Sequence, residues 1–152
     1  MNRINGLPAH ILLVHLVVVL VPVAALVLAA QAWSPSVRRW AGIAGPLLAA
    51  AALVAVPLTT QAGEWLQHRL RPTPLIDEHV EMGEQLLPWV IAVFVLSVAL
   101  WLLARRSQPL HRGLRFALAV VATVAALGAV AQTVRIGDSG AQAVWQGSVA
   151  SP

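Results

Sequence analysis

The chain has 152 residues, of which 59% are apolar and only 11% are charged; its formal net charge is +4 and its mean hydropathy is +0.77. Soluble domains carry about 25% charged residues, so we expect an integral membrane protein that forms one domain over residues 1–152. The absence of cysteine excludes disulfides, thiolate metal sites and iron–sulfur ligation.

Four apolar runs predict four membrane-spanning helices. The first run, from Ile11 to Ala32, contains no Asp, Glu, Lys or Arg and is about 33 Å long as a helix, enough to cross the hydrocarbon core. The predicted helices cover approximately residues 10–32, 41–65, 74–104 and 113–134, and a C-terminal tail, residues 135–152, is expected along the membrane interface. The predicted fold is an all-α, four-transmembrane-helix up-down bundle with short loops.

Two local patterns refine these boundaries. Thr73 followed by Pro74 is typical of a helix start, with the threonine as N-cap and the proline as first helical residue. The string G-D-S-G at residues 137–140 also occurs around the nucleophile of chymotrypsin-like proteases, but no triad accompanies it here. We interpret it as a glycine-flanked turn after the last helix.

Arginine, which supplies all ten basic residues, is unevenly distributed between the connections. The connections that follow the first and third predicted helices contain six arginines and no acid: Arg38, Arg39, Arg105, Arg106, Arg112 and Arg115. The other four arginines lie on the side that also carries all six acids. Cytoplasmic connections keep the Lys/Arg excess, so both termini are expected outside the cytoplasm. Topology explains the positive charge, and nucleic-acid binding is not expected.

Four of the five histidines are expected at the outer end of the bundle: His10, His15, His68 and His79. Neutral imidazole is a common ligand of divalent metals, and haem b held between two helices would use His15 as the best-buried axial ligand. His10 and His15 are five residues apart, so their directions on a helix differ by about 140°. They are therefore not expected to share one small site without distortion.

Polar residues close to these histidines are candidates for supporting contacts: Glu64, Thr59, Thr60 and Arg135. In the metal interpretation, Glu64 orients a ligating histidine. In the alternative interpretation, His15 hydrogen-bonds a threonine or Glu64 across the bundle while His68 and His79 face water. The spacing lacks a strong metal motif such as H-E-x-x-H. Arg135 is expected to pair with Glu64 or Glu84.

The segment from Gly6 to His15, G-L-P-A-H-I-L-L-V-H, resembles the H-P-L-H-P-x-L-V-H-F-P opening of domain-of-unknown-function family twenty-two thirty-one, which comprises small four-helix bacterial membrane domains. His10 and His15 match the second and third histidines of that opening, and Leu7 stands in place of the first. Residues 63–65, G-E-W, are similar to the family's G-x-D-W-like end of the second helix, and His79 is placed like its histidine at the start of the third. The resemblance implies a bacterial inner-membrane protein. It also implies a link to membrane electron transfer, because some relatives are fused to Rieske-type iron–sulfur domains.

Two functions follow as hypotheses. In the first, the protein binds haem or a metal at its outer end and serves a membrane redox protein or complex, with no catalytic activity of its own, since no nucleophile–base pair is present. In the second, it is a non-catalytic structural subunit or assembly factor. Such a subunit would pack against a larger complex through the Ala/Gly faces of its second and fourth helices, because small residues allow close helix approach in lipid.

Overall fold

The computed structural model describes residues 3–4, 7–106 and 110–145. Its elements, in chain order, are β1 (Arg3–Ile4), β2 (Leu7–Pro8), α1 (Ala9–Trp33), α2 (Pro35–Ala41), α3 (Ala44–Gln67), α4 (Pro74–Glu84), α5 (Leu86–Ala104) and α6 (Arg112–Trp145). β1 and β2 form a small antiparallel pair in which Arg3 lies opposite Pro8 and Ile4 opposite Leu7. The described chain is otherwise helical, and four of its segments are long and apolar enough to cross a membrane: Ala9–Trp33, Ala44–Gln67, Pro74–Ala104 and Arg112–Trp145. The prediction of an all-α protein with four such helices is confirmed.

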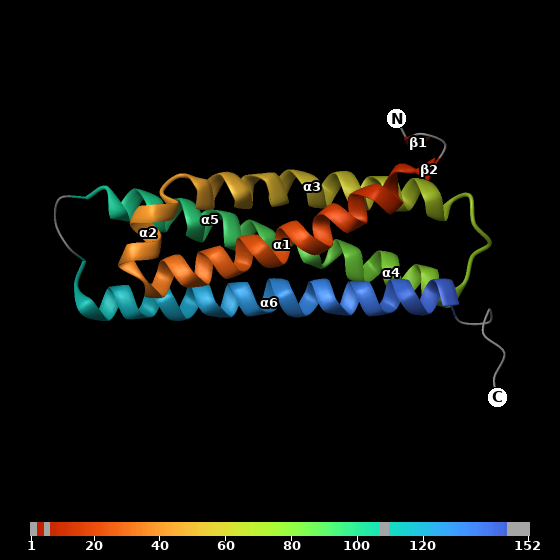
Figure 1. The fold of residues 1–152 in the computed structure, drawn as a ribbon. Coiled ribbons are helices and arrows are strands. Elements are labelled where there is room, and N and C mark those ends of the chain that lie inside the picture. The colour runs from red at the N-terminus through yellow and green to blue at the C-terminus, as the bar shows by residue number, and fades with distance from the viewer. Residues whose placement is uncertain (1–2, 5–6, 107–109, 146–152) are drawn as a thin grey trace.

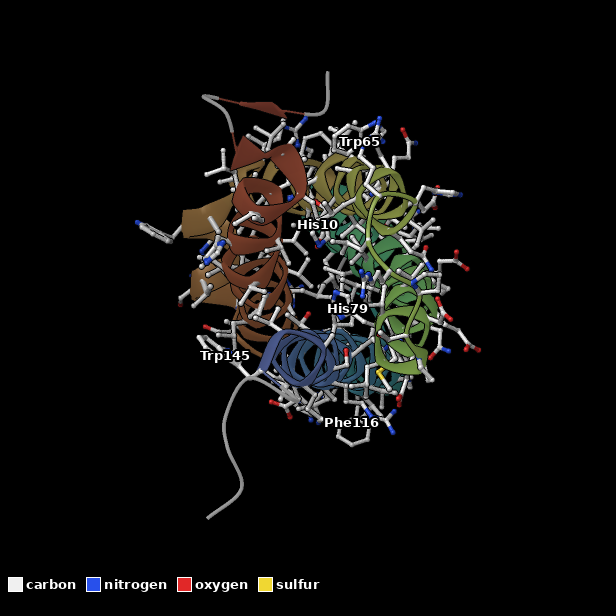
Figure 2. All side chains as sticks on the ribbon, turned by 90° about the vertical axis from the view of Figure 1, so that its right-hand side faces the viewer. His10, Trp65, His79, Phe116 and Trp145 are labelled. Atoms are coloured by element: carbon white, nitrogen blue, oxygen red, sulfur yellow. The ribbon has the colours of Figure 1, made fainter. Side chains whose placement is uncertain are left out.

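The long helices lie side by side along a common direction (Figure 1). α1 packs against α3 and α6, and α5 packs against the same two helices. At one end of the bundle, α1 and α4 begin and α3 and α6 end; we call this the histidine end, because His10 and His79 lie there (Figures 1 and 2). The opposite end holds α2 and the start of α6 and is called the arginine end.

The core is built largely from small side chains on α3 and α6. Nearly inaccessible alanines from these two helices face valine and leucine side chains of α1 and α5: Ala49, Ala52, Ala122, Ala126, Ala129, Val21, Leu28, Val90 and Val93. Small residues let helix backbones approach closely where no water drives them together. In the hypothesis of a structural subunit, the Ala/Gly faces of the second and fourth predicted helices contact a partner. In the structure these faces pack within the bundle itself.

Large apolar side chains cover the outside of the same helices. Val19 and Leu26 on α1, Leu47 on α3, and Val124 and Leu127 on α6 are each more than half exposed. In water such a surface would be unfavourable, whereas lipid tails solvate it. The outside of the bundle is therefore suited to hydrocarbon.

A short helix that the sequence did not predict, α2, connects α1 to α3 at the arginine end. The side chain of Ser34 accepts a hydrogen bond from the Val37 amide at 3.3 Å, and Pro35 occupies the first turn. These are favourable N-cap and first-turn residues, so the seven-residue segment folds as a helix. Its end is set by Gly42, whose φ of +49° favours glycine.

The predicted start of the third span is confirmed, but the span is not one continuous helix. The Thr73 side chain caps α4 by accepting from the Ile76 amide at 3.3 Å, with Pro74 as first helical residue. α4 ends at Glu84 and α5 begins at Leu86. The cause is Pro88, which has no N–H for the Glu84 carbonyl and whose ring crowds that carbonyl.

The last helix is longer than expected. α6 continues through residues 135–145 as helix, so the predicted glycine-flanked turn is wrong and the expected interfacial tail is helical as far as Trp145. Buried residues continue at helical spacing into this segment, with Ile136 and then Ser139 facing the bundle. The resulting contact with α4 outweighs the low helix propensity of the two glycines, Gly137 and Gly140. Residues 146–152 of the tail lie outside the described residues.

Candidate histidine site

His10 and His79 meet inside the bundle at the histidine end. Their ring centroids are 6.3 Å apart and the ring planes are at 80°, an edge-to-face arrangement. Both residues are half-buried, and Figure 2 shows their side chains directed into the space between the helices. The pair joins the start of α1 to α4.

Hydrogen bonds fix the orientation of both rings. The Nδ1 of His10 lies 3.1 Å from the Thr59 carbonyl oxygen on α3, and the Nδ1 of His79 lies 2.9 Å from Oγ of Ser139 on α6. That Ser139 hydroxyl donates its own hydrogen to the Ile136 carbonyl at 3.0 Å. Four helices, α1, α3, α4 and α6, therefore hold one pair of imidazoles.

These partners also determine which ring nitrogen carries the hydrogen. A carbonyl oxygen can only accept, so Nδ1 of His10 is the donor. Ser139 has already used its hydrogen, so its oxygen accepts from Nδ1 of His79. In their neutral forms, both imidazoles consequently present an unprotonated Nε2 with a free lone pair. This is the tautomer that metal-binding histidines adopt when their other nitrogen is hydrogen-bonded to protein.

Two glycines make room for the rings. A Cβ on Gly63 of α3 would lie 3.0 Å from Cε1 of His10, and a Cβ on Gly140 of α6 would lie 3.0 Å from Cε1 of His79. Both distances are shorter than ordinary carbon–carbon contacts of about 3.5–4.0 Å. Each imidazole thus packs directly against the backbone of a neighbouring helix.

A cavity of about 50 Å³ lies beside the pair and extends toward the bundle interior. Its walls include Val14 and Gly83, which lie one helical turn beyond His10 and His79, together with Thr59 and Glu64. This volume is enough for a few water molecules. A haem macrocycle does not fit beside rings that pack this closely against helix backbones.

The structure does not bring the other two predicted ligands to this site. His15, expected to be the best-buried axial ligand, is exposed on the outside of α1, and its Nδ1 is 2.6 Å from the Ile11 carbonyl of its own helix. His68 is also exposed and lies 2.7 Å from the Glu64 carbonyl. His15 is exposed because it points in a different direction on α1 from His10, which faces the interior.

Of the four residues predicted to support the histidines, only Thr59 bonds to the pair within the described structure. Thr59 contributes its carbonyl to His10, while its hydroxyl and that of Thr60 donate to carbonyls one turn earlier in α3, at 2.7 and 3.1 Å. Glu64 is exposed and borders the cavity, and within the described residues its carboxylate makes no hydrogen bond to either histidine ring. Arg135 is exposed and lines a surface hollow with Glu78 and Asp138, rather than meeting Glu64 or Glu84 as expected.

Ser139, Gly63 and Gly140 were not identified from the sequence as parts of this site. The signal for Ser139 was the helical spacing of Gln132, Ile136 and Ser139, which continues the buried face of α6. Within residues 9–106 and 110–145, no group of three or more His, Cys, Asp or Glu side chains is placed to hold a metal ion. Of the four predicted histidines, the described structure brings His10 and His79 together and leaves His15 and His68 apart from them.

The fold and its apolar exterior define a four-helix integral membrane protein. A family model described as "Predicted membrane protein (DUF2231)" matches residues 6–151, and the chain belongs to this family. The family is the one that the opening G-L-P-A-H-I-L-L-V-H resembles. No curated protein and no solved structure matches the chain significantly.

Proposed function

We propose that this protein is a single-domain, up-down bundle of the bacterial inner membrane that binds one divalent transition-metal ion between His10 and His79. The observation that carries the proposal is the paired orientation of the two rings. Each Nδ1 is held by a different helix, which leaves two Nε2 lone pairs for one ligand. Imidazole nitrogen suits zinc, copper, iron and nickel.

The separation of the rings is close to that required by a shared ion. Metal–nitrogen bonds of about 2.0–2.1 Å place the centroids of two imidazoles roughly 5 Å apart on a tetrahedral ion, and about 6.4 Å apart only when the two bonds are nearly in line. The observed 6.3 Å therefore requires the two rings to approach each other by about 1 Å when a tetrahedral ion binds. The Thr59 carbonyl and the Ser139 hydroxyl would hold the ligands in position, as partners of metal-bound histidines do.

In this proposal the protein has no catalytic activity and serves a membrane redox protein from the side on which the histidine end lies. The position of the pair at the end of the bundle, rather than at its middle, supports access by such a partner (Figure 2). Haem is not part of the proposal, because the site lacks the space for it.

Metal titration of the purified chain tests the proposal directly. The protein is purified in mild detergent through a tag without histidine, and Zn²⁺ binding is measured by calorimetry. We expect one ion per chain, with His10→Ala and His79→Ala each lowering the affinity at least about tenfold. Ser139→Ala, which removes only the supporting hydroxyl, is expected to lower it by about tenfold.

Two exposed histidines supply matched controls. His15→Ala and His68→Ala remove the same ring from positions outside the pair and should leave the affinity unchanged. A folded wild-type chain that binds no Zn²⁺, or an equal loss in His15→Ala, would refute metal binding by the pair.

We also propose that the histidine end and both termini face outside the cytoplasm. The acid-free arginine connections at the opposite end support this orientation. Because the chain has no cysteine, single-cysteine variants at exposed Leu70 and His111 report each end without background. An impermeant thiol reagent applied to intact spheroplasts should label Leu70→Cys and not His111→Cys; the reverse pattern would invert the orientation.

A further inference from the structure

A second hollow lies at the arginine end, between the end of α1 and the start of α6. Its volume is about 300 Å³, and it is lined by Ala32, Trp33, Arg112, Arg115, Phe116 and Ala119. Two guanidinium groups thus stand beside an apolar wall. The cavity beside the histidine pair, by contrast, has no arginine in its lining.

Positive charge accumulates around this hollow without a neighbouring acid. Burial and the adjacent Arg115 lower the pKa of Arg38, so these two cations lie close enough to repel each other. The six acids of the chain all lie in the 64–84 segment or at position 138, toward the histidine end. The start of α6 adds the positive end of a helix dipole. An anion here would relieve this repulsion, which no carboxylate of the chain offsets.

The apolar part of the hollow is held in place by specific contacts. Trp33 and Phe116 pack edge to face with ring centroids 5.9 Å apart. The indole N–H of Trp33 donates to the Thr123 hydroxyl at 2.9 Å. Arg38 donates to the Gln31 and Ala32 carbonyls at the end of α1, which fixes its guanidinium beside the hollow. The site is therefore formed by elements already ordered in the bundle.

We infer that this hollow binds an anionic phospholipid, with the phosphate on Arg112 and Arg115 and the upper part of an acyl chain along Phe116 and Trp33. A lipid fits better than a free phosphate because four of the six lining residues are aromatic or aliphatic and the lining continues into the lipid-facing surface of α6. Basic pockets between membrane helices commonly select such headgroups. The inference is independent of metal binding at the other end.

Lipid binding to the purified chain tests the inference. Dioleoylphosphatidylglycerol, dioleoylphosphatidylcholine or inorganic phosphate is added to the protein in non-ionic detergent. Bound lipid is counted by native mass spectrometry, and the melting temperature is followed by circular dichroism. We expect phosphatidylglycerol to bind and to raise the melting temperature, with phosphatidylcholine and inorganic phosphate much weaker.

Charge-matched variants locate the site. Arg112→Gln with Arg115→Gln should weaken phosphatidylglycerol binding at least about tenfold. Arg69→Gln with Arg71→Gln, which removes the same charge at the histidine end, should leave it unchanged. Phe116→Ala keeps every charge, is expected to weaken binding several-fold, and decides the question if the double arginine variant does not fold.

Three results would overturn the inference. Equal binding of phosphatidylcholine would show that charge is not recognised. Stabilisation by inorganic phosphate equal to that by phosphatidylglycerol would indicate a free-phosphate site. Unchanged binding in both Phe116→Ala and the double variant of Arg112 and Arg115 would place the lipid elsewhere.

Discussion

The tight contact between Gly128 on α6 and the indole of Trp89 on α5 makes a quantitative prediction. A Cβ added at Gly128 would lie 2.1 Å from Cζ3, 2.3 Å from Cε3 and 2.5 Å from Cη2 of Trp89. Carbon atoms in contact normally stay about 3.5–4.0 Å apart. In Gly128→Ala the indole must therefore retreat by roughly 1.5 Å.

The expected cost follows from two opposing effects. Overpacking a fitted contact costs about 1–3 kcal/mol, whereas alanine gains up to about 1 kcal/mol over glycine in helix propensity. Trp89 is 36% exposed, so part of its ring moves outward without entering the core. We expect Gly128→Ala to lower the free energy of unfolding by about 1–2 kcal/mol.

Equilibrium unfolding in mixed detergent micelles, followed by circular dichroism, measures this change. Gly137→Ala is the matched control, because it makes the same substitution in α6 at a position with no atom within 4 Å of the new Cβ. Combining Gly128→Ala with Trp89→Ala should remove the penalty. Equal stabilities of the Gly128→Ala and Gly137→Ala proteins would refute the steric argument.

Three further substitutions test other local features. Thr73→Ala removes the N-cap of α4 and should cost about 1 kcal/mol, seen as faster hydrogen exchange at the Ile76 amide. Gln31→Leu removes a buried amide oxygen that has no hydrogen-bond partner among the described residues and should raise the stability by about 1 kcal/mol in thermal unfolding; an unchanged midpoint would contradict this. Pro88→Ala restores a donor for the Glu84 carbonyl and should join α4 to α5, with slow hydrogen exchange of the new amide at position 88 as the readout.

The apolar runs were enough to predict the number and approximate bounds of the spanning helices, because backbone groups in lipid are satisfied within helices. The Thr73 cap was also predictable, since N-capping is a local interaction. The continuation of α6 was not predicted, because Gly137 and Gly140 locally favour a turn. Tertiary contact with α4 outweighed their local preference.

The histidine pair was only partly predictable. Helix geometry indicated that His10 and His15 face different directions, but it did not say which one faces inward. That choice depends on the neighbours of α1, and α3 places the Thr59 carbonyl beside His10. One of the two interpretations predicted that His79 faces water, because no local pattern indicates that Ser139, 60 residues away, lies beside it.

The short helix α2 has a consequence for how the protein sits in the bilayer. It lies at the arginine end of the bundle (Figure 1). The indole of Trp40, which lies on α2, is 89% exposed. Tryptophan favours the headgroup layer, and the adjacent Arg39 favours the water beyond. Together they favour one immersion depth at this surface, and the exposed Trp145 at the end of α6 does the same at the opposite surface, where the imidazoles are.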